Sequence, residues 1–178
     1  MKENRIILVS CGPSEKDFLR KIALTTEKEF RIPVAFEENH VDLNQFYNPG
    51  RRQYDANKLL SFIAGGSNDE FTKLIGLFRV DLFIPILTYI FGQAMLNGHS
   101  AVASVYRLRN ELYGLKKDES VLLSRTTKEV IHELGHTFGL IHCHVSSCVM
   151  RSSTYVEDID QKSHHFCARC RASLEEGR

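Results

Sequence analysis

Three histidines and one glutamate are the residues in this sequence best suited to carry out chemistry. From residue 132 the chain reads HELGHTFGLIH, so His132, His136 and His142 follow the spacing HExxHxxGxxH. Histidines four residues apart lie on one face of a helix, where both imidazoles can reach one metal ion. A third histidine after a glycine can return to the same ion. Three protein ligands leave one position open, which is typical of a catalytic zinc site.

The glutamate of this motif is placed for proton transfer rather than for metal binding. Glu133 follows His132 directly, so we expect its carboxylate to lie beside the metal and to act as the general base in peptide-bond hydrolysis. Gly139 is expected to end the helix with a positive φ, which turns the chain back toward the site. One alternative stays open: a zinc- and peptide-binding protein with weak or no catalysis has the same motif.

Two residues downstream of the histidines are candidates for the surroundings of the metal. Met150 lies eight residues after His142. In metzincins a methionine turn lies beneath the zinc, so we expect Met150 to form a hydrophobic base under the imidazoles rather than to act as a ligand. Tyr155 is a candidate to approach the metal or the substrate oxyanion, and its alternative role is packing.

Four of the five cysteines are concentrated at the C-terminal end. They form two closely spaced pairs, C-x4-C and C-x2-C: Cys143 with Cys148, and Cys167 with Cys170. Two such pairs are typical of a structural zinc site, in which four thiolates leave no open position. The alternative is a pair of disulfides, which a reducing compartment disfavours.

The two metal sites share a short stretch of chain. Because Cys143 directly follows His142, one loop could serve both ions, and the thiolate-bound zinc would fix the loops that carry His142 and Met150. A second alternative is a zinc ribbon that binds nucleic acid. Three arginines give this segment some positive charge: Arg169, Arg171 and Arg178.

Taken together, these motifs resemble those of the archaemetzincins. The signature of that family joins the histidines directly to the cysteines, as HExxHxxGxxHCxxxxCxM followed by CxxC, and here it runs from His132 to Met150 and on to Cys167 and Cys170. Three upstream stretches also look like the family: 80–82, 91–94 and 104–108. The resemblance implies a compact, metzincin-like single domain with two Zn²⁺ ions, one catalytic and one structural, and Glu133 as the catalytic base.

The elements that must position these residues are of mixed type. Strands are predicted at 5–10, 32–36, 74–78 and 101–108, and helices at 14–30, 52–64 and 126–139. This order predicts an α/β (α+β) fold, with a mixed twisted sheet beside the active-site helix. We expect Thr126 or Thr127 to cap that helix with Glu129 as the capping-box partner.

The sequence also predicts how the chain is divided and where substrate binds. Residues 1–142 are expected to form an N-terminal metzincin-like subdomain, and residues 143–178 a short C-terminal subdomain with the methionine turn and the zinc-bound cysteines. The strand at 101–106 is expected to form the rim of the cleft and to pair with an extended substrate. Its alternative role is that of an ordinary core strand.

Composition excludes several other classes of protein. The chain has 178 residues, 43% hydrophobic and 25% charged, with a net charge of +1, which suits one packed domain and disfavours a nucleic-acid-coating protein. The apolar run at 6–9 is too short for a secretory signal, and the stretch 80–91 is too short to span a membrane. We therefore expect a soluble, cytoplasmic monomer that acts on a peptide or protein substrate, without a membrane or nucleic-acid partner.

Overall fold

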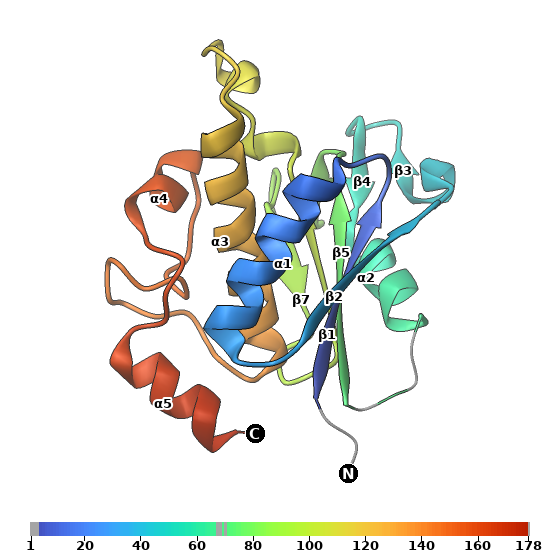
Figure 1. Cartoon of the computed structure of the whole chain (residues 1–178). Helices are drawn as coiled ribbons and strands as arrows, with labels where there is room; N and C mark the ends of the chain where they lie inside the picture. Colours follow the sequence, from blue (N-terminus) through green and yellow to red (C-terminus); the bar gives the residue numbers. More distant parts are fainter. Residues whose placement is uncertain (1–3, 67–68, 70, 178) are drawn as a thin grey trace.

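A five-stranded sheet forms the centre of the protein, in the order β2-β1-β5-β8-β7 (Figure 1). Its strands are β1 (Arg5–Cys11), β2 (Val34–Asn39), β5 (Thr72–Phe78), β7 (Gly92–Ala94) and β8 (Ser100–Ser104). The first four in spatial order run parallel, and β7 is antiparallel to β8, so the predicted mixed sheet is confirmed. The structure is a computed structural model that describes residues 4–66, 69 and 71–177.

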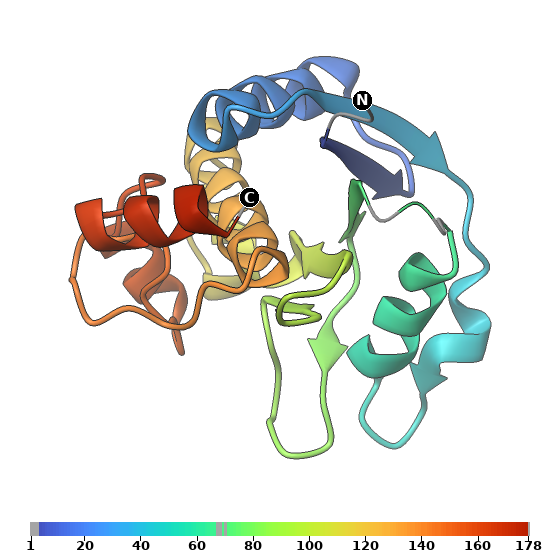
Figure 2. The same ribbon diagram turned by 90° about the horizontal axis from the view of Figure 1, so that it is seen from below.

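The described residues form five α-helices, of which α1, α2 and α3 cover the faces of this sheet. They are α1 (Lys16–Phe30), α2 (Ala56–Ala64), α3 (Glu119–Thr137), α4 (Val156–Gln161) and α5 (Ala168–Glu176). Figures 1 and 2 show α1 and α3 on one face and α2 on the other. A small second sheet joins β3 (Tyr47–Asn48), β4 (Gln53–Asp55) and β6 (Leu82–Phe83), and short 3-10 helices lie at Leu43–Phe46, Tyr106–Leu108 and Asn110–Tyr113. None of the helices in the described part of the chain is both long and apolar enough to cross a membrane.

The central strands β5 and β8 are buried on both faces because their side chains alternate between the two helix layers. In β5, Ile75 and Leu77 pack in the cluster formed with α1 and α3, whereas Leu74 and Phe78 pack with α2. Gly76 lies between them on the α2 side, where a Cβ atom would come within 2.7 Å of the Ile63 side chain. Helix α2 therefore packs directly on the backbone of the central strand.

Helix α3 begins earlier than the sequence predicts. Its N-cap is Asp118, whose Oδ1 accepts hydrogen bonds from the backbone N–H groups of Ser120 and Val121 at 2.9 and 3.1 Å. Only Glu119 and Ser120 of the first turn are exposed and polar, and the three apolar residues that follow at 121–123 are consecutive and half-buried, so this part of the sequence lacks the spaced apolar pattern by which a helix is recognised.

The predicted capping residues have other roles. Thr126 and Thr127 lie inside α3, where their hydroxyls donate to the carbonyls four residues earlier, so the prediction that either one caps the helix is wrong. The predicted capping-box partner Glu129 is also wrong, because it is buried and pairs with Lys162 instead.

The strand predicted at the cleft rim lies inside the sheet. β8 is paired on both sides, by β5 and by β7, and all five of its residues are buried. The edge strand beside the cleft is β7, which has only three residues and no β-branched or aromatic side chain, so its sequence does not indicate a strand. The prediction that 101–106 forms the rim is therefore wrong, and its alternative as a core strand is correct.

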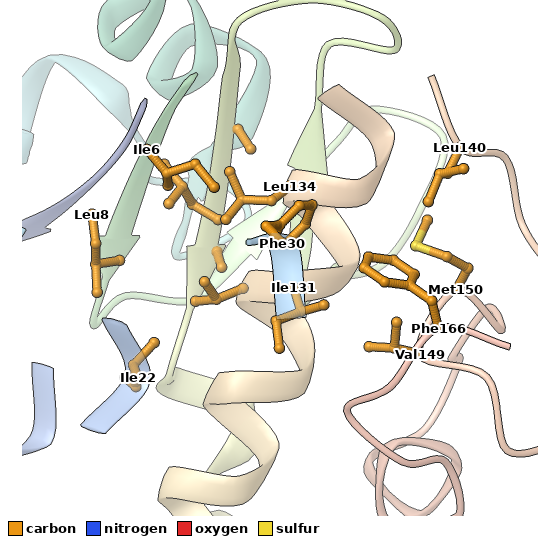
Figure 3. Packing of buried hydrophobic residues seen from close by; sticks show 14 of the residues in the cluster. Ile6, Leu8, Ile22, Phe30, Ile131, Leu134, Leu140, Val149, Met150 and Phe166 are labelled. Atoms are coloured by element: carbon orange, nitrogen blue, oxygen red, sulfur yellow. The ribbon is translucent and has the colours of Figure 1, made fainter. Parts of the chain in front are cut away.

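The C-terminal residues 143–177 pack against α3 on the side away from the sheet (Figures 1 and 3). Met150 and Phe166 belong to the same buried cluster as Phe30 of α1, and the rings of Phe30 and Phe166 meet edge to face at 5.4 Å.

One buried carboxylate, that of Glu29, anchors the C-terminal segment by polar contacts. Glu29 accepts hydrogen bonds from the backbone N–H of Phe166 at 2.9 Å and from Arg171, and its Oε2 lies 2.9 Å from His165 Nδ1.

We expect Glu29→Gln to destabilise the fold by about 1–3 kcal/mol, because the substitution removes a buried charged acceptor and leaves Arg171 without its anionic partner. Calorimetric unfolding should show a midpoint several degrees below that of the unmodified chain. Glu175→Gln is the matched control: Glu175 pairs with Arg31 at 3.1 Å on the exposed surface, where such pairs contribute about 0–1 kcal/mol. Equal shifts for the two variants would contradict the anchoring role of Glu29.

Candidate functional site

The three histidines of the sequence motif meet at one point. His132 and His136 lie on one face of α3, which ends at Thr137, and Gly139 takes φ +86° so that the chain turns back and presents His142. One ring nitrogen from each histidine lies within 4.8 Å of the other two. The positive φ expected at Gly139 is therefore present, and the three imidazoles are arranged as a group that could hold a metal ion.

Backbone carbonyls orient two of these rings. His132 Nδ1 lies 2.8 Å from the carbonyl oxygen of Val149, and His136 Nδ1 lies 2.7 Å from that of Leu140. Since a carbonyl only accepts, each Nδ1 carries the proton and each Nε2 keeps its lone pair for a metal. The two Nε2 atoms are 3.2 Å apart. Tetrahedral zinc with nitrogen ligands at about 2.0–2.1 Å requires neighbouring donors to be about 3.3–3.4 Å apart, so this spacing fits zinc.

The environment of the site lowers the pKa values of the three histidines, which favours their neutral forms, and raises the pKa of Glu133. Burial lowers the pKa of His132 well below its usual range, with a further contribution from the Lys162 ammonium, and it also lowers the pKa values of His136 and His142. Burial raises the pKa of Glu133 well above its usual range, and the nearby Glu129 raises it further. These directions hold without a metal ion, and a bound cation would lower the pKa of Glu133.

Met150 lies directly against the active-site helix. It is fully buried, and a Cβ atom at Gly135 would come within 2.5 Å of its sulfur. Figure 3 shows Met150 with Val149, Leu140 and Phe166 on the side of α3 opposite the sheet. Met150 therefore packs against Gly135, the residue that precedes His136 in the helix. This is the region where the sequence predicts a hydrophobic base.

A cavity of about 690 Å³ opens over the histidines. Its lining includes Glu133, the edge strand β7, Ile84 and the segments 87–90 and 152–155. Gly92 of β7 approaches Glu133 so closely that a Cβ atom there would lie 2.7 Å from its Cγ and Oε1. Tyr155 also lines the cavity, with 63% of its surface exposed, and its approach to the metal or the oxyanion stays a prediction.

The four C-terminal cysteines form a second group of ligand atoms within 4.8 Å of one another: Cys143, Cys148, Cys167 and Cys170. All are free thiols, so the structure does not contain the alternative disulfides. The sulfurs of Cys143 and Cys167 are 3.8 Å apart. Tetrahedral zinc with thiolates at about 2.3 Å requires about 3.8 Å between neighbouring sulfurs, so this group also fits zinc.

Hydrogen-bond donors favour the thiolate forms that bind metals. The backbone amide of Cys170 lowers the pKa of the Cys167 thiol to about 7, at the N-terminus of α5. The backbone N–H of Cys167 donates to the sulfur of Cys148 at 3.3 Å. Burial raises the pKa values of Cys148 and Cys170 in the absence of metal. The fifth cysteine, Cys11, belongs to neither group, and burial raises its pKa to about 12.

Sequence reasoning missed three residues that shape the cavity. Gly92 leaves room for Glu133, and the buried pair of Glu129 and Lys162 lies in the cavity lining. The i, i+4 spacing of Glu129 and Glu133 places both on one helix face and could have indicated the first. No local signal indicates Lys162, which lies 33 residues beyond Glu129 in the sequence.

Comparison with known proteins agrees with this geometry. The chain matches the family model of peptidase family M54 over residues 13–176. It is 33% identical over 176 residues to the archaemetzincin of Saccharolobus solfataricus, a match that covers 98% of this chain and 95% of the relative.

Two solved structures are also similar. The crystal structure of archaemetzincin from Methanopyrus kandleri superimposes with a TM-score of 0.85 and 32% identity, covering 98% of this chain and 95% of that one. A zinc-dependent peptidase from Methanocorpusculum labreanum superimposes with a TM-score of 0.84 and 28% identity, covering 95% and 99%. The predicted resemblance is confirmed, and the chain belongs to peptidase family M54, the family of the archaemetzincins.

Proposed function

We propose that this chain hydrolyses peptide bonds at one zinc ion held by His132, His136 and His142, with Glu133 as the general base. That it is a zinc metallopeptidase acting on a peptide or protein substrate follows from its family; the roles of individual residues are the proposal. The observation that carries it is the hydrogen bonding of two Nδ1 atoms to carbonyls, which leaves two Nε2 atoms 3.2 Å apart and free to bind.

The chemistry divides between the metal and the protein. Zinc with three protein ligands lowers the pKa of a bound water and polarises a substrate carbonyl. Glu133 accepts a proton from the attacking water and passes it to the leaving amine. Its burial suits both steps, because a raised pKa makes the carboxylate a better proton acceptor and the protonated acid remains available to the amine.

The edge strand β7 supplies a surface for an extended substrate. It pairs with β8 on one side only, and its three residues line the cavity beside Glu133. A peptide that adds to this free edge would be held by main-chain hydrogen bonds in line with the histidines. Tyr155 also lines the cavity, and we propose that its phenol donates a hydrogen bond to the developing oxyanion.

We further propose that the four cysteines hold a second, structural zinc ion, which makes residues 143–178 a C-terminal subdomain on the N-terminal subdomain 1–142. The backbone N–H of Cys143 donates to the carbonyl of Met150 at 2.9 Å, so the loop that follows His142 is joined directly to the methionine turn. A metal bound by the cysteines would hold the loop after His142 and the methionine turn together, and would thereby preorganise the catalytic site.

The proposed structural role also bears on the nucleic-acid alternative. Arg171 donates to Glu29, and Arg169 contacts the sulfur of Cys143 at 3.7 Å, so both side chains have partners inside the protein. Arg178 lies outside the described residues.

The free thiols favour a reducing compartment, which supports our proposal of a cytoplasmic location, and a monomer remains the expectation.

Replacement of Glu133 by alanine should separate catalysis from metal binding. We expect Glu133→Ala to lower kcat/KM for peptide hydrolysis by about 10²–10⁴-fold while zinc content is unchanged, because the carboxylate moves protons and does not bind the metal. Glu38→Ala on the exposed end of β2 is the control. A Glu133→Ala variant with unchanged activity contradicts the assignment, and an inactive unmodified protein with full zinc content favours the non-catalytic alternative.

Elemental analysis should find two zinc ions per chain, one in His136→Ala and at most one in Cys167→Ser. Because Cys143 and His142 share a loop, the Cys167→Ser variant should also lose zinc from the histidine site at a lower chelator concentration and unfold at a lower temperature. A single zinc that His136→Ala does not remove would mean that the histidine site is empty. If the histidine site of Cys167→Ser retains zinc at the same chelator concentration as the unmodified chain, the cysteine-bound metal does not preorganise the catalytic site.

A methyl group at the edge strand should disturb the general base. In Gly92→Ala the new Cβ lies 2.7 Å from the side chain of Glu133 and from the carbonyl oxygen of Val102, so the carboxylate must move. We expect kcat to fall by about tenfold to a hundredfold at unchanged zinc content. Gly50→Ala is the control, because its Cβ meets Asn48 Oδ1 at an ordinary 3.4 Å. Equal kcat for Gly92→Ala and the unmodified chain would exclude close packing at this position.

A further inference from the structure

The cavity contains a buried ion pair that the proposed mechanism does not use. Glu129 lies one helical turn before Glu133 in α3, and Lys162 follows α4. Their side chains are 4% and 0% exposed, Glu129 Oε1 lies 3.5 Å from Lys162 Nζ, and both residues line the cavity with the histidines. Charged groups so deeply buried are rare without a specific reason.

Two polar atoms at this end of the cavity lack a hydrogen-bond partner among the described residues. Glu129 Oε1 and Ser153 Oγ are buried in the cavity lining and form no hydrogen bond with the described residues, although Glu129 Oε1 keeps its 3.5 Å ion pair with Lys162 Nζ. A third such atom, Gln93 Oε1, lies on β7 in the same lining. Lys162 Nζ, in contrast, donates to the carbonyl of Arg151 at 3.0 Å. Buried polar atoms are normally paired, so an acceptor and a hydroxyl left open in a cavity point to a polar group on the substrate.

The walls and the charges of this pocket limit what that group can be. Leu87, Tyr89 and Phe91 are in the lining, so a long apolar or aromatic body fits against the walls. A cationic end would lie beside the Lys162 ammonium, which already balances Glu129. An anionic end would lie beside the carboxylates of Glu129 and Glu133. A neutral hydrogen-bond donor at the end of an aromatic ring satisfies every one of these conditions.

We propose that this pocket selects a tyrosine side chain next to the scissile bond, with its phenol O–H donating to Glu129 Oε1 and its oxygen accepting from Ser153 Oγ. Lys162 is a positioning residue, because it holds the Glu129 carboxylate at the end of the pocket. This inference rests on the proposed zinc peptidase function, since the zinc site fixes which side chain enters the pocket.

A matched pair of ligands tests the pocket without requiring turnover. We would prepare two peptidyl hydroxamates that differ by one oxygen, with a 4-hydroxybenzyl or a benzyl side chain beside the zinc-binding group. Calorimetry on the zinc-loaded full chain should show the phenol compound binding about tenfold more tightly, because the benzyl compound leaves Glu129 Oε1 and Ser153 Oγ unpaired. Equal affinities, tighter binding of the benzyl compound, or no binding of either would overturn the proposal.

Two variants connect the preference to these residues. Ser153→Ala removes one hydroxyl that has no hydrogen-bond partner among the described residues, so it should fold normally and reduce the phenol preference several-fold. Glu129→Leu combined with Lys162→Met replaces the pair by apolar side chains and should abolish or reverse the preference while the benzyl compound still binds. If the preference persists in Ser153→Ala and in the double variant, the phenol is recognised elsewhere and the proposal is wrong.

The outcomes also distinguish this inference from the function on which it rests. If the unmodified chain prefers the phenol compound but cleaves no peptide, the pocket is confirmed and the catalytic proposal fails. If the chain cleaves peptides with tyrosine or phenylalanine beside the scissile bond at equal kcat/KM, the catalytic proposal holds and the pocket assignment fails.

Discussion

The site depends on the packing of α3 against the chain that doubles back beneath it. The carbonyls of Leu140 and Val149 fix two imidazole rings, and Met150 lies against the helix at Gly135. A helix alone places two histidines on one face but leaves their rings free to rotate and to exchange tautomers. The returning segment removes that freedom, because each carbonyl accepts only from a protonated Nδ1 and thereby directs Nε2 toward a common point.

The C-terminal segment 143–177, which doubles back beneath α3, has few apolar contacts within itself. Its helices α4 and α5 have six and nine residues, and their few buried side chains pack against other parts of the protein. So small a unit is rarely stable without an additional constraint. Two constraints are present in the structure: the contacts of Glu29 with Arg171 and with the Phe166 backbone, and the cluster of four thiols whose sulfur spacing suits zinc.

The sequence predicts those features that depend on local spacing, and the structure differs where distant segments decide. The histidine and cysteine groups form as their spacing indicates, since a helical turn and a short loop bring them together. The position of β8 depends on β7, a strand of three residues without β propensity, so the rim was assigned to the wrong strand. The pairing of Glu129 with Lys162 depends on how the C-terminal segment folds over α3, which no local pattern reveals.

The same segment supplies the positive charge that this helix face requires. Glu129 and Glu133 are one turn apart and buried. Burial raises the pKa of both carboxyls, Glu129 raises that of Glu133 further, and a protonated Glu133 could not accept a proton from water. Lys162 opposes this, because its ammonium lowers the pKa of both carboxyls and also lowers that of His132. The one lysine thus favours an ionised base and a neutral ligand at the same time. A C-terminal segment that also presents Met150 and the cysteines is therefore part of the active site in an electrostatic as well as a structural sense.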